Sequence, residues 1–321
     1  MKDILYLVIP CYNEEEVLQE TAGRLLETIN NMIERQLISC KSKILFVNDG
    51  SKDKTWSIIQ DLHERNNTIS GINLSRNRGH QNALLAGLMT AKEFSDMTIS
   101  LDADLQDDIN VIGKFVEQYY NGSDIVYGVR SSRETDTFFK KVTALTFYKL
   151  MRTLGVDMVY NHADYRLMSK RALEGLSEYK EVNLFLRGMV PLIGYKYSIV
   201  EYERHERFAG ESKYPLKKMV AFALDGITSL SIKPIRIIAG IGFAIFIIGG
   251  AALLYSLIVN FMGRTVTGWT SLTLSIWMLG GIQLLSLGVI GEYIGKIYNE
   301  TKRRPRFIIS DKLTDTDKND K

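Results

Sequence analysis

The stretch Met97-Thr-Ile-Ser-Leu-Asp-Ala-Asp-Leu-Gln-Asp-Asp108 passes from apolar to acidic over a few residues. Its apolar part, Met97–Leu101, is typical of a short buried strand, and the carboxylates of Asp102 and Asp104 follow directly. Open α/β sheets bind ligands beyond the carboxyl ends of their strands, and two carboxylates one residue apart suit a hard divalent cation that phosphates also hold. The pattern recurs as Asp315-Thr-Asp317 with no strand before it, so the surrounding sequence must decide what the pair does.

The rest of residues 1 to about 130 alternates short β-rich runs with amphipathic segments. We expect strands at Ile4–Ile9, Ile44–Asn48, Ser70–Leu74, Thr98–Leu101 and Asp124–Tyr127, and helices at Glu14–Arg35, Lys54–Arg65, Gln81–Phe94 and Asn110–Asn121. Strands that alternate with helices predict an α/β domain with a mostly parallel sheet and right-handed crossovers. Beyond it we expect a basic, aromatic helix from Phe138 to Leu154 and a strand over 195–203.

Polar segments follow four of these strands. They are Pro10–Glu14, Asn48–Asp53, Ser75–Gly79 and Asp102–Asp104. Each segment alone is ordinary turn chemistry, because Asn, Asp, Gly and Ser are the usual turn residues. Four of them at the carboxyl ends of successive parallel strands meet at one edge of the sheet, which favours a ligand-binding crevice there.

Composition and missing motifs narrow the chemistry. The 321 residues carry a formal charge of only +3, so we expect no nucleic-acid partner. Cys11 and Cys40 are no disulfide framework, which indicates a reducing compartment. The chain has no G-x-x-x-x-G-K-[ST] loop, no H-E-x-x-H and no G-x-S-x-G elbow. The remaining interpretation is a site in which carboxylates bind a metal ion together with a phosphate group.

The C-terminal third contains two long runs without charge, Ile237–Met262 and Thr265–Gly291. At about 1.5 Å rise per residue, each exceeds the roughly 30 Å hydrocarbon core of a bilayer. The alternative is a pair of buried core helices, but such long uncharged runs are rare in soluble domains. Lysines and arginines flank the runs on both outer sides, so the positive-inside rule predicts that both termini and the N-terminal domain are cytoplasmic.

These observations divide the chain into five parts. We expect a cytoplasmic α/β domain over 1–214, an interfacial amphipathic helix over 215–233, transmembrane helices over 235–262 and 268–294, and a basic, then disordered tail over 296–321. An ordinary helix packed on the domain is the alternative for 215–233. Small residues at Gly249-Gly-Ala-Ala252 would allow close helix packing, so we also expect a homo-oligomer in the cell membrane.

Three of the polar segments resemble a known family. Val8–Glu14, Val47–Asp53 and Leu101–Asp107 are similar to the family 2 glycosyltransferases of GT-A fold. Ala163–Ser169, Ala209–Tyr214 and the two C-terminal runs narrow the resemblance to the polyprenyl-phosphate glycosyltransferases. Within these the chain looks most like the bacterial bactoprenol glucosyltransferases (GtrB-like), relatives of dolichol-phosphate mannose synthase. The resemblance covers about residues 4 to 308 and departs from the usual pattern at Arg78 and Ala163.

The resemblance implies roles for individual residues. Those that would bind the nucleotide sugar are Pro10, Tyr12, Asn13, Glu14, Asp49, Ser51, Arg76, Asp102, Ala103 and Arg130. Asp104 would hold Mg²⁺ or Mn²⁺ on the diphosphate and so take part in catalysis. Asp164 resembles the candidate catalytic carboxylate of these enzymes, and proton abstraction, orientation of the acceptor or metal, and a purely structural role all remain open for it.

Two anions must meet in such a reaction, so cations must hold them. Arg130 and Arg133 follow the last strand of the nucleotide half, and Arg207, Ser212 and Lys213 lie in the polar loop ahead of the expected membrane segments. We expect Arg133 and the three loop residues to bind the lipid phosphate; solvated surface charge is the alternative for each of the arginines and for Lys213.

The expected reaction is an inverting, metal-dependent transfer of a sugar to undecaprenyl phosphate at the cytoplasmic membrane face, for cell-envelope glycan modification. The resemblance favours glucose from UDP-glucose. Transfer of N-acetylglucosamine, N-acetylgalactosamine, galactose or mannose to the same lipid is one alternative, and a non-catalytic membrane protein that binds nucleotide sugars is another.

Overall fold

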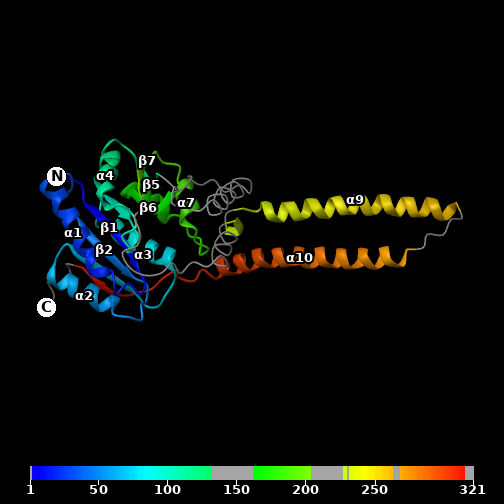
Figure 1. Cartoon of the computed structure of the whole chain (residues 1–321), viewed down its shortest axis with the longest axis horizontal. Coiled ribbons are helices and arrows are strands. Elements are labelled where there is room, and N and C mark those ends of the chain that lie inside the picture. Colours follow the sequence, from blue (N-terminus) through cyan, green and yellow to red (C-terminus); the bar gives the residue numbers. More distant parts are fainter. Residues whose placement is uncertain (1, 132–161, 204–226, 230, 263–267, 315–321) are drawn as a thin grey trace.

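A mostly parallel β-sheet forms the centre of the N-terminal domain (Figure 1). The computed structural model describes residues 2–131, 162–203, 227–229, 231–262 and 268–314. The strands are β1 (Leu5–Cys11), β2 (Lys43–Asn48), β3 (Ile69–Leu74), β4 (Met97–Ser100), β5 (Ile125–Arg130), β6 (His162–Ser169), β7 (Tyr197–Tyr202) and β8 (Ile309–Leu313). Their order in the sheet is β7-β5-β6-β4-β1-β2-β3-β8, and β6 and β8 run antiparallel to their neighbours.

Helices cover both faces of the sheet. They are α1 (Leu18–Glu34), α2 (Thr55–Arg65), α3 (His80–Lys92), α4 (Ile112–Tyr120), α6 (Lys170–Ser177) and α7 (Leu186–Leu192). Alternate residues of β1 belong to two separate cores. Leu5, Leu7 and Ile9 pack with α1, α2 and α4, whereas Tyr6 and Val8 pack with α3, α6 and α7. A parallel strand buried on both faces needs apolar residues at every position, which explains why β1 reads as a continuous apolar run.

The predicted α/β domain and its mostly parallel sheet are confirmed, but β6 was not predicted as a strand. It inserts between β4 and β5 and runs antiparallel to both, with Ser100 opposite Arg166. Because of this direction, the first residues of β6 lie at the same edge as the carboxyl ends of β1 to β5. That placement brings Asp164 beside the segment that follows β4.

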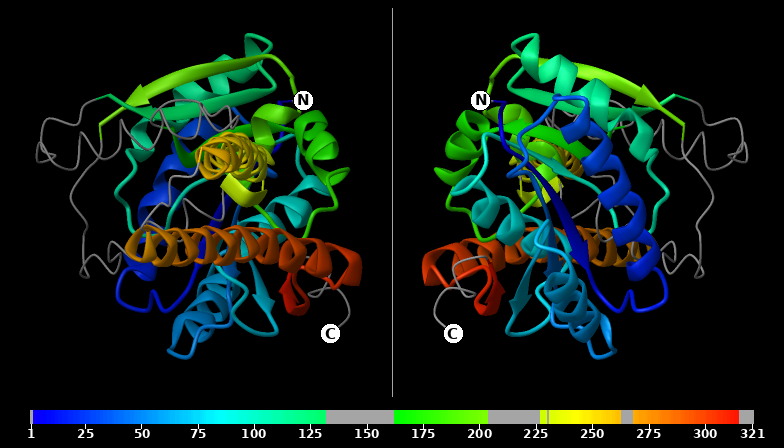
Figure 2. Two further views of the ribbon diagram at one scale, coloured as in Figure 1. Left: turned by 90° about the vertical axis from the view of Figure 1, so that its right-hand side faces the viewer. Right: turned by 90° about the vertical axis from the view of Figure 1, so that its left-hand side faces the viewer.

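Two long helices project from the same side of the domain: α9 (Lys233–Phe261) and α10 (Trp269–Lys302) (Figure 1). Figure 2 shows α9 end-on and α10 crossing it obliquely, so the two are splayed. Among the described residues, one segment, Met278–Lys302, is long and apolar enough to cross a membrane. Only 6% of the apolar 18-residue stretch within it is buried inside the protein. The second membrane span, at α9, stays a prediction, as does the orientation of the termini.

The expectation of a disordered tail is wrong for its first part. Residues Ile309–Leu313 form β8, which pairs antiparallel with the edge strand β3. The apolar side chains of Ile309 and Leu313 pack against the two cores, and Ser75 donates its N–H to the Ile308 carbonyl at 2.9 Å. An unpaired sheet edge offers ready backbone partners, and composition alone does not reveal such an edge.

Candidate active site

Backbone N–H groups and side-chain acceptors join the loops after β1 and β2. Asn13 donates its N–H to Ser51 Oγ at 2.9 Å, and Lys52 donates its N–H to Asn13 Oδ1 at 2.9 Å. Glu14 donates its N–H to Thr55 Oγ1 at 2.9 Å. Asn13 has φ of 54°, a left-handed conformation that Asn adopts more readily than most residues. The first two predicted nucleotide-sugar loops therefore lie together at the edge of the sheet.

Three further predicted nucleotide-sugar residues lie near this junction and differ in their access to solvent. Pro10 is buried inside β1, opposite Val47 of β2. Tyr12 follows the strand and is 41% exposed. Arg76 is exposed in the loop after β3. Tyr12 and Arg76 are thus free to meet a ligand, whereas Pro10 shapes the end of the strand.

Asp49 joins the second loop to the third. Its buried carboxylate accepts the Arg78 N–H at 2.7 Å and the Gly79 N–H at 2.9 Å, one on each oxygen. Burial raises the pKa of this carboxyl, and the two N–H bonds partly offset the effect. Gly50 has φ of +62°, and a Cβ there would lie 2.6 Å from the Arg76 backbone. Asp49 therefore positions the loop from which α3 starts at His80.

The acidic segment after β4 is held from beneath by α1. Thr21 Oγ1 donates to the Ala103 carbonyl at 2.7 Å, and Ala103 itself is buried. The Asp102 side chain on one side of it is 45% exposed. On the other side, Asp104 Oδ1 accepts the Gln106 N–H at 3.2 Å, with Leu105 in a left-handed conformation (φ 55°). The segment thus turns sharply just after the predicted metal residue.

Asp164 lies at the centre of a cluster that the sequence did not reveal in full. Arg187 on α7 donates to its carboxylate through Nε at 3.2 and 3.3 Å and through a terminal nitrogen at 2.9 Å. His80 Nε2 lies 3.6 Å from Asp164 and 3.7 Å from Asp102. Arg166, buried on the same face of β6, lies 3.5 Å from the carboxylate. His80 therefore bridges the predicted sugar-binding and catalytic aspartates.

The electrostatics of this cluster favour an ionised Asp164. Burial raises the pKa of its carboxyl, but Arg187 and His80 outweigh burial and hold the pKa well below its ordinary value. For His80, burial lowers the pKa, whereas the hydrogen bond to Asp164 and the charge of Asp102 raise it to about 9. A carboxylate held by a guanidinium and an imidazolium is a weak base. The geometry therefore suits orientation better than proton abstraction.

A second group of side chains lies at the far end of the acidic segment. Tyr202 on β7 donates its hydroxyl to Asp107 Oδ1 at 2.6 Å, and a terminal nitrogen of Arg130 lies 3.9 Å from the same oxygen. Burial and the nearby charges of Asp102 and Asp104 raise the pKa of Asp107 to about 6. Arg130, which we predicted to bind the nucleotide sugar, thus lies beside Asp107 in the acidic segment.

The donor set fits a divalent cation that shares its coordination with a ligand. Asp102, Asp104 and Asp107 are close enough that the first two raise the pKa of the third, a concentration of negative charge that a cation would relieve. Among the described residues, no group of three His, Cys, Asp or Glu side chains lies close enough to hold a metal alone. Mg²⁺ commonly takes one or two carboxylates, with water and substrate phosphates completing its shell.

The predicted lipid-phosphate residues Arg133, Arg207, Ser212 and Lys213 lie outside the described residues, as does most of the expected interfacial helix. Sequence reasoning missed His80, Arg187 and Tyr202. His80 directly follows the third polar segment and could have been found from that position. Arg187 and Tyr202 had no sequence signal, because their strands and helices reach the site only through the tertiary fold.

The end of α10 also contacts the segment that leads into α7. Glu300 accepts the N–H groups of Val182 at 2.8 Å and Asn183 at 2.7 Å, and the Asn183 side-chain amide at 2.7 Å. Further along, Arg78 donates from its guanidinium to the Pro305 carbonyl at 3.1 Å. Residues at the end of the candidate membrane span and just after it therefore support both the α7 side of the site, which carries Arg187, and the β3–α3 loop.

Comparison with protein families and with individual proteins gives concordant results. The profile of glycosyl transferase family 2 matches residues 6–177, and that of the GtrB C-terminal hairpin matches residues 233–297. The chain is 56% identical to the uncharacterized glycosyltransferase YkoT of Bacillus subtilis, over 95% of this chain and 91% of that protein. It is 42% identical to the prophage bactoprenol glucosyl transferase homolog of Escherichia coli, over 94% and 97% of the two chains.

A bactoprenol glucosyl transferase of Shigella phage SfV is 40% identical, over 94% of this chain and 97% of the phage protein. Among solved structures, mannosyl-3-phosphoglycerate synthase from Rubrobacter xylanophilus is 18% identical, with a TM-score of 0.46 over 70% of this chain and 71% of that chain.

Proposed function

Because this chain belongs to glycosyltransferase family 2 and carries a GtrB C-terminal hairpin, we propose that it transfers a sugar from a nucleotide sugar to a polyprenyl phosphate at a membrane surface. The similarity to proteins named bactoprenol glucosyl transferase extends over nearly the whole chain, hairpin included. Bactoprenol is a polyprenyl lipid, so the acceptor proposed here is undecaprenyl phosphate, and the donor is UDP-glucose.

The observation that carries the proposal is the cluster around Asp164. It places an ionised carboxylate, a guanidinium and an imidazolium beside Asp102, at the edge where the β1 and β2 loops meet. Sugar transfer between two phosphates needs cations to hold the anions and a polar wall to orient the sugar. This edge provides both.

In the proposed reaction, an oxygen of the acceptor phosphate attacks the anomeric carbon while the bond from that carbon to the diphosphate oxygen breaks. Direct attack from the opposite face inverts the configuration of the sugar. The acceptor needs little activation, because a phosphate monoester has its second pKa near 6 and is largely a dianion at neutral pH. Asp164 therefore orients the acceptor or the sugar, since Arg187 already engages both of its oxygens.

Asp102 and Asp104 take separate roles in this proposal. Asp104 would hold Mg²⁺ or Mn²⁺, and Asp102 would face the sugar beside His80. A cation held at Asp104 would supply Lewis-acid stabilisation of the diphosphate leaving group. The β1 and β2 loops hold the nucleoside, with Tyr12 exposed to stack on the base. The membrane helices α9 and α10 both span the bilayer, with the catalytic domain in the cytoplasm.

The proposal is tested with the full chain in membranes. Labelled UDP-glucose, UDP-N-acetylglucosamine, UDP-N-acetylgalactosamine, UDP-galactose and GDP-mannose are offered in turn with undecaprenyl phosphate, and the lipid-linked sugar and released nucleotide are measured. We expect transfer from UDP-glucose, lost in Asp104→Asn and dependent on added divalent metal. Transfer from a different donor would overturn the assignment of the sugar, and full activity of Asp104→Asn would overturn that of the metal residue.

A further inference from the structure

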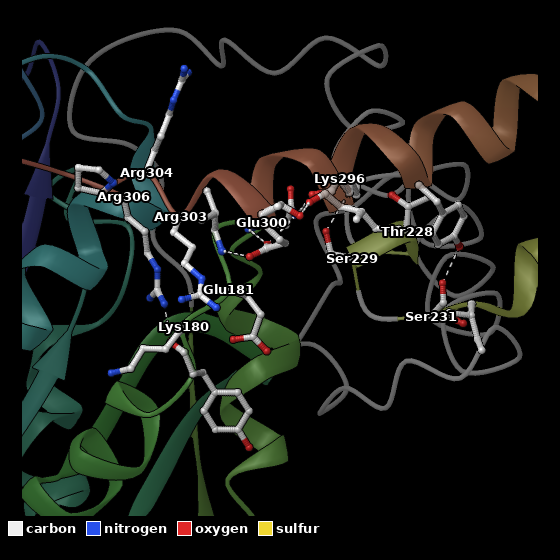
Figure 3. A pocket seen from close by; sticks show the side chains of 18 of the residues that line it. Lys180, Glu181, Thr228, Ser229, Ser231, Lys296, Glu300, Arg303, Arg304 and Arg306 are labelled. Atoms are coloured by element: carbon white, nitrogen blue, oxygen red, sulfur yellow. Dashed lines mark hydrogen bonds between the residues drawn. The ribbon is translucent and has the colours of Figure 1, made fainter.

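A cavity of about 1250 Å³ lies where α10 returns to the domain, away from the candidate active site. It is bounded by the 178–183 segment, by Thr228, Ser229, Ser231 and Ile232 ahead of α9, and by the last turns of α10 with the chain that follows (Figure 3). None of the site residues around Asp102 and Asp164 lines it. The cavity is therefore a separate feature of the molecule.

Cations outnumber acids around this cavity. Its basic lining residues are Lys180, Lys296, Arg303, Arg304 and Arg306, and its acidic ones are Glu178, Glu181 and Glu300. Glu300 is already engaged by the N–H groups of residues 182 and 183. Arg303 and Arg304 are exposed and form no ion pair with any residue in the described parts of the chain. The Arg303 side chain points toward Lys180 and Glu181, and that of Arg304 points away from them (Figure 3), so Arg303 is placed to bind an anion and Arg304 adds positive charge at the rim.

The other wall of the cavity is apolar. Ile232, Tyr293 and Ile297 line it on the side of the long helices. The cavity also lies at the end of Met278–Lys302, the segment that can cross a membrane. A cationic rim beside an apolar wall, at one end of a candidate membrane span, matches the two halves of a phospholipid: a phosphate head group and the start of its acyl chains.

We propose that this cavity binds the head group of an anionic phospholipid, with its phosphate on Arg303, the charge of Arg304 nearby at the rim, and its glycerol and first acyl carbons against Ile232 and Ile297. The cations around the cavity come from two separate parts of the chain: Lys180 from one, and the other four from the end of α10 and the chain that follows it. A bound phosphate reduces their mutual repulsion, so the lipid stabilises the junction between α10 and the domain. The sugar acceptor binds elsewhere, at the Asp102–Asp164 edge.

The experiment uses the full chain in detergent, titrated with short-chain phosphatidylglycerol or phosphatidylcholine and followed by native mass spectrometry and thermal unfolding. Phosphatidylglycerol is expected to bind to the wild-type protein and raise its unfolding temperature, and phosphatidylcholine is not. Arg303→Gln/Arg304→Gln removes both positive charges beside the phosphate and is expected to bind phosphatidylglycerol about 10- to 30-fold more weakly. The double variant Arg35→Gln/Arg65→Gln, two exposed arginines away from the cavity, removes the same charge and is expected to bind normally.

Equal loss of binding in both double variants would mean that only net charge matters and would overturn the site. Unchanged affinity in Arg303→Gln/Arg304→Gln would overturn it as well. A third arm adds polyprenyl phosphate to the phosphatidylglycerol-bound protein. Displacement of the phospholipid would reassign the cavity to the acceptor and so overturn the proposal, whereas retention of the phospholipid supports it. None of these readouts depends on glycosyl transfer.

Discussion

The contact between Glu300 and the chain ahead of α7 permits a quantitative prediction for Glu300→Gln. In the wild type, Glu300 Oε2 accepts the backbone N–H of Val182 at 2.8 Å. Glu300 Oε1 accepts the backbone N–H and the side-chain amide of Asn183, each at 2.7 Å. Gln has one acceptor oxygen in place of two. When that oxygen stays with Asn183, its NH₂ group faces the N–H of Val182, and that donor loses its partner.

A hydrogen bond to a charged group contributes about 1.5–3 kcal/mol. The contact is only partly buried, which weakens it, so we take a value around the low end of this range, about 1–2 kcal/mol. Every 1.4 kcal/mol corresponds to a factor of ten, so opening of the segment at Val182 becomes about 5- to 30-fold more frequent. Asn183 keeps its acceptor and loses only the charge of the partner, so its change is smaller.

Hydrogen exchange resolved to single amides measures both effects. The matched control is Glu292→Gln, an exposed glutamate on the same helix whose side chain forms no hydrogen bond or ion pair with the described residues. We expect control and wild type to exchange alike. Exchange at Val182 within twofold of the wild type in Glu300→Gln would refute the reasoning, because the contact would then contribute nothing to the order of the segment.

Two further predictions concern the Asp164 cluster. Arg187→Gln removes the strongest influence that lowers the pKa of Asp164. We expect kcat/KM to fall about 10- to 100-fold and the acid limb of its pH profile to move to higher pH. An acid limb at the same pH as in the wild type would contradict this. The pKa of His80 is raised from 6.5 to about 9. Protonated His80 therefore contributes fully to the stability of the folded protein below pH 6.5, and this contribution is lost as the pH rises through about 9. The unfolding temperature of the metal-free wild type should therefore fall more between pH 6.5 and 9 than that of His80→Gln. If the unfolding temperatures of the two proteins changed in parallel with pH, the pairing of His80 with Asp164 and Asp102 would be contradicted.

Local periodicity predicted most of the first half of the fold. The strands around Ile4–Ile9, Ile44–Asn48 and Ser70–Leu74 and the helices between them lie where the apolar pattern placed them, with ends shifted by a few residues. The pattern works here because each parallel strand is buried on both faces and each crossover helix on one. It failed for β6, since Tyr165-Arg-Leu-Met-Ser169 mixes a charged residue into a buried strand.

The sequence by itself determined that four polar loops follow successive strands, and hence that Pro10–Glu14, Asn48–Asp53 and Asp102–Asp104 share one edge of a sheet. That follows from chain connectivity, because parallel strands joined by right-handed crossovers all end on the same side. Only the tertiary structure decided what completes that edge. Asp164 reaches it through an antiparallel strand and Arg187 through α7, while β8 joins the sheet at a different edge, alongside the outer strand β3. Such contacts depend on which surfaces remain unpaired once the rest has folded, and no local pattern in the sequence records that.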